Sequence, residues 1–173
     1  MNYSKFNDEV LFAIDPVVKI SKEDITHLKQ LAERTTRKRS RLCAHKDIRS
    51  PLHEMLIVHK QDTYVRPHKH LGKSESFHLI DGEVLLLLFE DNGNLREVIQ
   101  MGDYNSGKIF YYRIDNPIFH SIVIKSESTV FHESTKGPFI RENTIFADWA
   151  PEEGDEKGIF QFMKRINQKN LER

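Results

Sequence analysis

Four residues have the types and the spacing needed to bind a metal ion: His68, His70, Glu75 and His120. Residues two apart on a β-strand point to the same face, so His68 and His70 are expected to face the same side. Glu75 follows five residues after His70, beyond Gly72, where a turn can bring its carboxylate back toward the imidazoles. His120, on a later predicted strand, completes a shell of three imidazoles and one carboxylate. Such a shell suits a divalent transition metal such as Fe, Mn, Ni or Zn and leaves positions open for a substrate.

Three further side chains are predicted to bind substrate near this shell. Tyr64 and Arg66 share the period-two face of the two histidines. An arginine in a metal pocket would bind a carboxylate or a phosphate through two hydrogen bonds. Lys73, in the turn that follows, is the third candidate. The competing interpretation of Arg66 is a solvated arginine on the outside of a barrel.

Proton transfer requires a side chain that can give and take a proton within reach of the ligand. Tyr112 and Glu133 are the candidates for this catalytic role. Glu133 alternates with His132 along one predicted strand, so only one of the two can face the cavity, and the sequence does not decide between them. If both candidates point outward, a binding protein is favoured over an enzyme.

The other histidines are assigned to different surroundings. Strand alternation places His78 on the face opposite Glu75, which excludes it from the shell. His53 and His59 bracket a predicted strand and are expected at the surface. His120 has a competing interpretation as an unligated histidine in an apolar core.

The elements that must position these residues are short strands preceded by a helix. Ser21 is predicted to cap a helix that begins at Lys22, with Asp24 at the capping-box position. From Glu54 onward, eight short apolar runs separated by turn signals predict an antiparallel sandwich or barrel. These runs cover residues 55–58, 64–66, 77–80, 84–89, 96–99, 109–112, 118–124 and 129–133.

The run Val84–Phe89 is apolar on both faces, which predicts a central strand covered from both sides. The turn signal at 91–94 closes a predicted hairpin behind it. After an acidic break, an amphipathic stripe from Ile159 to Ile166 predicts a C-terminal helix that packs on the barrel or on a partner subunit. The chain therefore divides into three expected parts: an N-terminal arm with a helix (1–50), a barrel (51–153) and a C-terminal helix (154–173).

Composition argues against several classes of protein. The 173 residues carry 26 Lys and Arg against 26 Asp and Glu, a balance that argues against a globally basic nucleic-acid binder. The single cysteine, Cys43, excludes a disulfide framework and is interpreted as a small packing residue. No signal peptide is visible and the longest apolar run is too short to span a bilayer, so we expect no membrane partner and a cytoplasmic location.

Charge is unevenly distributed along the chain. Between Glu33 and Arg49 there are seven Lys and Arg against two Asp and Glu, and no aromatic residue that would stack on nucleic-acid bases. The first interpretation of this stretch is a solvated helix end or a subunit contact. The second is a site at the pocket mouth that holds the phosphate of a sugar phosphate or a nucleotide sugar.

The spacing around the histidines resembles the first metal motif of the cupin superfamily. The motif reads His68, one residue, His70, four residues, Glu75, six residues, Gly82. Its leading glycine is replaced by Asp62. This resemblance implies that the four proposed ligands hold a metal inside a β-barrel.

The second cupin motif is degraded. His120 is in place, but Asp115 and Pro117 stand where proline and glycine are expected, and Ile124 replaces an asparagine. The resemblance to the superfamily therefore depends mainly on the first motif.

Longer segments resemble the WbuC family, cupin-fold metalloproteins encoded with O-antigen and other surface-polysaccharide genes. The segments are Arg39–His45, Tyr64–His70, Phe89–Gly93, Glu133–Phe139 and Phe146–Pro151. The resemblance implies an all-β, cupin-type double-stranded β-helix (jelly-roll) barrel with flanking N-terminal and C-terminal helices. It also implies a homodimer.

Two functions follow from this resemblance. The first is a metalloenzyme that acts on a sugar or sugar-nucleotide precursor of O-antigen or capsule by Lewis-acid chemistry, as an isomerase, epimerase or dioxygenase. The second is a non-catalytic sugar-binding or sensor cupin. The residues alone do not decide between the two.

Overall fold

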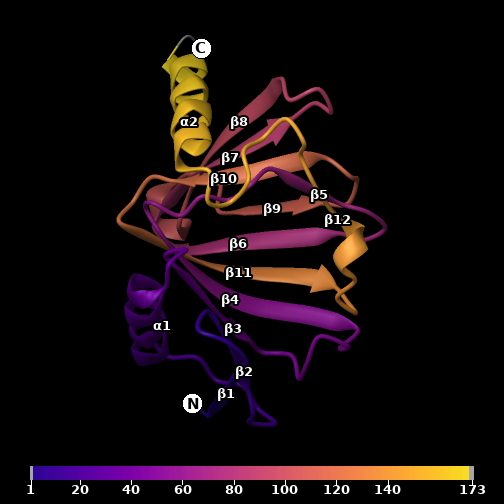
Figure 1. Ribbon diagram of the computed structural model, residues 1–173. Coiled ribbons are helices and arrows are strands. Elements are labelled where there is room, and N and C mark those ends of the chain that lie inside the picture. Colours follow the sequence, from indigo (N-terminus) through magenta and orange to yellow (C-terminus); the bar gives the residue numbers. More distant parts are fainter. Residues whose placement is uncertain (1, 172–173) are drawn as a thin grey trace.

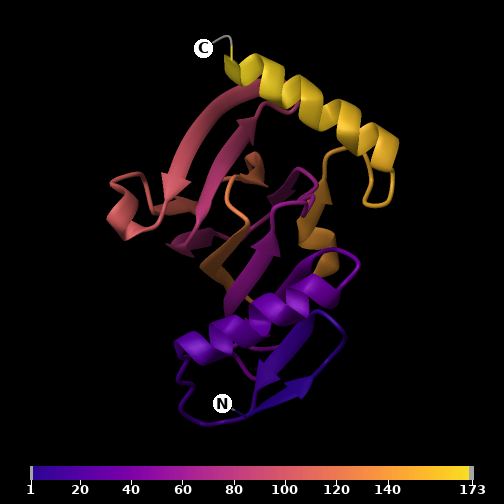
Figure 2. The ribbon, with the colours of Figure 1, turned by 90° about the vertical axis from the view of Figure 1, so that its left-hand side faces the viewer.

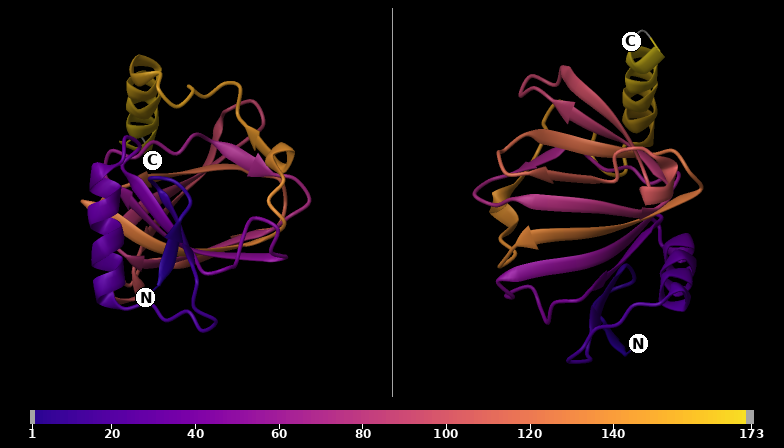
Figure 3. Two further views of the ribbon diagram at one scale, coloured as in Figure 1. Left: turned by 60° about the horizontal axis from the view of Figure 1, so that its bottom comes forward. Right: turned by 180° about the vertical axis from the view of Figure 1, so that it is seen from behind.

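The structure, a computed structural model, describes residues 2–171 and contains two sheets that face each other (Figure 1). In spatial order, the seven-stranded sheet contains β1 (Tyr3–Lys5), β2 (Val10–Ala13), β3 (Arg39–Cys43), β4 (Leu52–Lys60), β11 (Ser128–Lys136), β6 (Glu75–Asp81) and β9 (Tyr111–Ile114). The five-stranded sheet contains β12 (Thr144–Phe146), β5 (His68–His70), β10 (Phe119–Ile124), β7 (Glu83–Phe89) and β8 (Leu95–Gly102). Short 3-10 helices occupy Tyr104–Ser106 and Arg141–Asn143. The two facing sheets confirm the predicted barrel, seen end-on at the left of Figure 3.

Helix α1 (Lys22–Arg34) begins at the predicted residue. The Ser21 hydroxyl accepts a hydrogen bond from the Asp24 backbone N–H, and the Asp24 carboxylate accepts one from the Ser21 N–H, so both ends of the capping box are present. Leu28 and Ala32 pack on the outer face of the seven-stranded sheet, where they meet Leu42, Leu56 and Val58. The helix therefore holds β3 and β4 from outside.

Helix α2 (Glu156–Leu171) covers the outer face of the other sheet, so the two helices lie on opposite sides of the barrel (Figure 2). Phe162 and Ile166 are buried in a cluster that includes Leu87 and Phe89 of β7. Packing on the barrel is thus confirmed. Phe160 does not belong to the packed face, because it is 69% exposed. None of the helices in the described residues is long and apolar enough to cross a membrane.

Strand β7 is the predicted central strand, between β10 and β8. Val84 and Leu86 belong to the cluster between the sheets, while Leu87 and Phe89 belong to the cluster under α2. The turn at 91–94 closes the predicted hairpin, because β7 and β8 are antiparallel neighbours. Both faces of β7 are therefore apolar because both are covered, as the sequence predicted.

The N-terminal segment contains three strands that the sequence did not predict. Strand β3 is antiparallel to β4, from Arg39 opposite His59 to Cys43 opposite Met55. Strand β2 is parallel to β3, and β1 pairs with β2. As a result β4 is an interior strand of the sheet. Strand β12 was also missed, and the predicted strand at 64–66 is wrong, because the chain has no regular structure there.

Candidate metal centre

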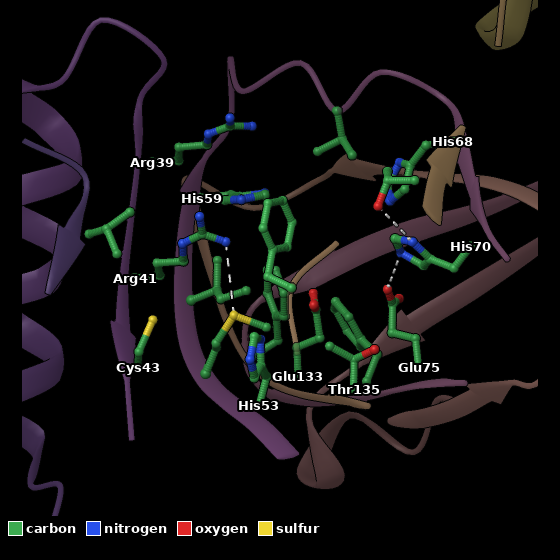
Figure 4. A pocket seen from close by; sticks show the side chains of 18 of the residues that line it. Arg39, Arg41, Cys43, His53, His59, His68, His70, Glu75, Glu133 and Thr135 are labelled. Carbon is green, nitrogen blue, oxygen red and sulfur yellow. Dashed lines mark hydrogen bonds and ion pairs between the residues drawn. The ribbon is translucent and has the colours of Figure 1, made fainter. Parts of the chain in front are cut away.

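The four predicted ligands meet at one end of the space between the sheets (Figure 4). His68 and His70 come from β5, and His120 on β10 lies directly opposite His68 in the register. Glu75, the first residue of β6, approaches from the other sheet. One ligand atom from each residue lies within 4.8 Å of all the others. Two ligands on opposite sides of a metal ion are about 4.2 Å apart, so a small contraction brings the four onto one ion.

Backbone carbonyls fix the orientation of two of the imidazoles. Nδ1 of His68 lies 2.9 Å from the Arg66 carbonyl, and Nδ1 of His120 lies 3.0 Å from the Ile118 carbonyl. Because a carbonyl only accepts, each Nδ1 carries the proton and each Nε2 keeps a lone pair. Nε2 of His120 is buried without a hydrogen-bond partner, which fits an atom that ligates a metal.

The third imidazole and the carboxylate are also held in place. His70 lies opposite Thr144 of β12, and its Nδ1 is 3.2 Å from the threonine hydroxyl. A hydroxyl can donate or accept, so Thr144 supports either tautomer of the ring. On the other side of the ring, Nε2 is 3.0 Å from Oε2 of Glu75. Tyr112 donates its hydroxyl proton to Oε1 of the same carboxylate, at 3.2 Å.

Electrostatics favour a negative carboxylate at Glu75. Burial lowers the pKa of His68 to about 3, so this ring is neutral at pH 7. Burial alone would raise the pKa of Glu75, but the imidazoles of His120 and His70 beside its carboxylate outweigh burial and hold this pKa well below its usual value. Burial alone would lower the pKa of His120, but the charge of Glu75 outweighs it and raises this pKa. Neutral imidazoles and one ionised carboxylate are the donor set of a divalent transition metal.

Glu133 faces the cavity, which answers the question that strand alternation left open. It lies on β11 opposite Met55 of β4 and Phe77 of β6, two residues of the core between the sheets. His132 does not line the cavity. Burial and the nearby charge of Glu75 raise the pKa of Glu133 to about 8. Figure 4 shows its carboxyl between the metal centre and the opposite end of the cavity.

Two of the three predicted substrate-binding residues line this cavity, which has a volume of about 450 Å³. Lys73 is one of them. Arg66 is the other, but its guanidinium already donates to the Ala147 carbonyl at 2.9 Å and lies 3.4 Å from a carboxylate oxygen of Glu152. Lys73 is therefore the better placed of the two to meet a ligand.

Tyr64 does not line the cavity. Its hydroxyl donates to the Pro151 carbonyl at 3.0 Å, and its ring contacts Phe162 of α2. The prediction relied on strand alternation, which does not apply because Tyr64 lies outside any strand.

Strand alternation succeeded where the chain is extended. Lys69, between His68 and His70, points away from them, and its amino group lies 2.6 Å from Asp91. His78 is exposed on the outer face of β6, as predicted.

Sequence reasoning missed a second group of cavity residues. Arg39, Arg41 and Cys43 alternate along the inner face of β3, and His53 and His59 lie on the neighbouring β4. The two histidines were expected at the surface, which is wrong: they are 6% and 7% exposed. His59 lies opposite Arg39 of β3, and the ring of His53 stacks on that of His45, so the segment before β4 covers both. Burial raises the pKa of Cys43 to about 11, so it stays a thiol, in line with its interpretation as a packing residue.

The chain is similar to known proteins in part of its sequence and in its fold. A family model described as Domain of unknown function (DUF6016) matches residues 20–101, a span that includes three of the four ligands but not His120. No curated protein matches the chain in sequence. Among solved structures, protein SO0799 from Shewanella oneidensis matches 72% of this chain and 77% of its own, with 10% identity and a TM-score of 0.50. CapF matches 62% of this chain with 18% identity and a TM-score of 0.50.

The chain has the cupin fold. The predicted double-stranded β-helix barrel with a helix on each side is thereby confirmed. The match extends over only 31% of CapF, so it concerns the cupin barrel and not the whole of that protein. Oxalate oxidase in complex with glycolate is a more distant match, with 12% identity and a TM-score of 0.46 over 68% of this chain and 57% of its own.

Proposed function

We propose that this cupin is a metal-dependent enzyme in which His68, His70, Glu75 and His120 hold one divalent ion at the end of the cavity. The observation that carries the proposal is the arrangement of the three imidazoles. Each has its Nδ1 engaged outside the cluster, which leaves three Nε2 atoms and one carboxylate to meet at a point. When bound, the ion supplies Lewis-acid polarisation of a substrate oxygen.

The donor set limits the choice of ion. Three imidazole nitrogens and one carboxylate oxygen suit Fe, Mn, Ni or Zn. Tyr112 is a positioning residue in this account, because its hydroxyl donates to Glu75 and thereby orients the carboxylate. Burial and the charge of Glu75 raise the pKa of Tyr112 well above its usual value, so the phenol keeps its proton.

Glu133 is the proposed proton-transfer group. A carboxyl with a pKa of about 8 is divided between its acid and base forms near neutral pH, which is the condition for efficient general acid–base catalysis. In its ionised form Glu133 accepts a proton from a carbon next to a carbonyl, and in its protonated form it returns the proton to the neighbouring position. This chemistry favours an isomerase or epimerase over a dioxygenase, and over a binding protein that has no use for a proton acceptor.

The substrate class is proposed from resemblance. The WbuC-like segments favour a sugar or sugar-nucleotide precursor of surface polysaccharide. CapF, which has the same fold, is described as a capsular polysaccharide assembling protein of Staphylococcus aureus. The 450 Å³ cavity is large enough for one hexose with a substituent.

A ligand screen with two protein variants tests the proposal. Thermal unfolding of metal-loaded protein is followed with a panel of sugar phosphates and nucleotide sugars, since a ligand that binds the native state raises the melting temperature. A compound that stabilises the wild type is then tested for turnover. We expect Glu133→Gln to keep binding and lose turnover, with Glu127→Gln, at an exposed residue at the end of the β10–β11 turn, as the matched control. Equal turnover by Glu133→Gln and the wild type would contradict the assigned role.

A further inference from the structure

The cavity extends from the metal centre to a second polar region, here named the basic end, formed by Arg41 of β3 and His59 of β4. Lys73 enters the same cavity from the turn between β5 and β6. Figure 4 shows Arg41 and His59 across the cavity from His70 and Glu75. Arg41 and Lys73 are both close enough to Glu133 to lower its pKa, so the two cations lie near the same carboxyl. The basic end therefore faces the same space as the metal centre.

Arg41 is exposed, lines the cavity and forms no ion pair among the residues that the structure describes. The hydrogen-bond partner found for its side chain is Sδ of Met55, 3.9 Å from Nη1, and a thioether is a weak acceptor. Arg39, two residues earlier on the same strand face, is different: it pairs with Glu9 and Glu153, each at 3.3 Å. The protein thus neutralises one arginine and leaves the next one open to the cavity.

His59 and Lys73 also lack partners. His59 is 7% exposed, and its Nδ1 is buried without a hydrogen-bond partner. Burial and the nearby charges of Arg39 and Arg41 lower the pKa of this ring to about 3, so it is neutral and still has a proton to donate. Lys73 forms no ion pair within the described part of the chain, although it lines the cavity. Nδ1 of His59 is thus a buried polar atom without a partner, which is costly unless a ligand satisfies it.

We propose that Arg41, Lys73 and His59 form a binding site for an oxyanion of the substrate, a carboxylate or a phosphate, while another part of the same molecule reaches the metal centre. The planar guanidinium matches both oxyanions through two parallel hydrogen bonds. The amino group of Lys73 adds a second positive charge, and the imidazole adds a neutral donor. The substrate is thus an anionic sugar derivative rather than a neutral sugar. That the other part of this substrate reaches a metal ion rests on the proposed function.

Three sugars that differ only at carbon 6 test the inference: glucose 6-phosphate, glucuronate and glucose. Each is titrated by calorimetry into the full-length chain after removal of metal, so that only the protein groups contribute. We expect at least one of the two anionic sugars to bind about tenfold or more tightly than glucose. A preference for glucose 6-phosphate identifies phosphate as the natural group, and a preference for glucuronate identifies carboxylate.

Three variants test which residues cause the preference for an anionic sugar. Arg41→Met and Lys73→Met should each remove most of it, and either suffices if the other fails to fold. Arg49→Met removes an arginine that is 86% exposed and paired with Asp47, so it should leave the preference unchanged. Equal affinity for the three sugars, binding of none of them, or a preference that survives both cavity variants would overturn the inference. Metal binding is measured separately on the same protein, so a lost metal site and a lost anion site are distinguishable.

Discussion

The two ends of the cavity satisfy their polar groups in opposite ways. At the metal centre, the three imidazoles have a hydrogen-bond partner behind them, and the Glu75 carboxylate is approached by Tyr112 and His70. At the basic end, Arg41 forms no ion pair within the described residues, and Nδ1 of His59 has no hydrogen-bond partner. The first end is pre-organised for a single small ion, whereas the second is arranged for a ligand that brings several acceptor atoms.

The two ends also depend on different elements. Strands β5, β10 and β12 of the five-stranded sheet supply the histidines and Thr144, while β3 and β4 of the other sheet supply Arg41 and His59. Glu75 of β6 reaches the metal centre from the seven-stranded sheet, and Glu133 of β11 stands on the inner face of the same sheet. Because the histidines and the groups of the basic end lie on different strands, changes to one set should leave the other intact.

The largest expected effect is the stabilisation of the metal centre by its ion. Metal at about a thousand times its dissociation constant should stabilise the wild type by about 4 kcal/mol. His120→Ala removes one ligand and should abolish most of this gain, measured as the shift of the unfolding midpoint with and without metal. His78→Ala, which removes an exposed histidine from β6, is the control and should keep the full gain. If metal stabilised His120→Ala and His78→Ala equally, the ion would not be bound by His120.

A smaller effect is expected from the carboxyl between the two ends, in metal-free protein. Glutamate ionises near pH 4.5 when unfolded, whereas Glu133 ionises near 8 in the folded chain because of burial and the charge of Glu75. Between these values the unfolded state releases a proton that the native state keeps, so the stability of the wild type falls as pH rises through this window.

Glu133→Gln has no such proton, so its free energy of unfolding should not fall in this way. The difference in free energy of unfolding between the variant and the wild type should grow from pH 5 to pH 8 and reach about 2–4 kcal/mol. Denaturant unfolding at the two pH values measures it. A difference that does not change with pH would show that Glu133 is already ionised at pH 5.

The smallest expected effect concerns the support behind one ligand. Thr144→Val keeps the shape of the side chain and removes the hydroxyl beside Nδ1 of His70. Loss of such a partner weakens metal binding by about tenfold. Competition with a chelator measures the affinity, and the sugar preference at the basic end should not change. A tenfold loss of that preference would mean that the two ends are coupled.

The parts of the fold that the sequence predicted are those where local pattern and burial agree. Ser21 and Asp24 form a capping box whose partners are three residues apart, and β7 is apolar on both faces because the core covers one and α2 the other. His68, His70 and Glu75 were found because a strand and one turn place all three. These relations are local in the chain, so one sequence is enough to show them.

The parts that were missed depend on contacts between distant segments. Strand β3 has the composition of a charged, solvated stretch, yet Leu42 packs under α1 while both arginines line the polar cavity, Arg39 partly buried and Arg41 exposed. His59 is buried where β3 pairs with β4, and His53 where its ring stacks on that of His45. The predicted position of Tyr64 is wrong because strand alternation does not hold where the chain is not a strand. A polar interior is thus the feature that pattern rules fail to predict.

The central claim is that the three imidazoles and Glu75 hold one ion, and elemental analysis tests it most directly. The chain is purified without a metal-affinity tag, loaded with Fe, Mn, Ni or Zn, and freed of excess metal by gel filtration before the metal-to-protein ratio is measured. The account predicts close to one ion per chain for the wild type and almost none for the His68→Ala/His70→Ala double variant. A wild type that retains none of the four metals, or a double variant that retains as much as the wild type, would contradict it.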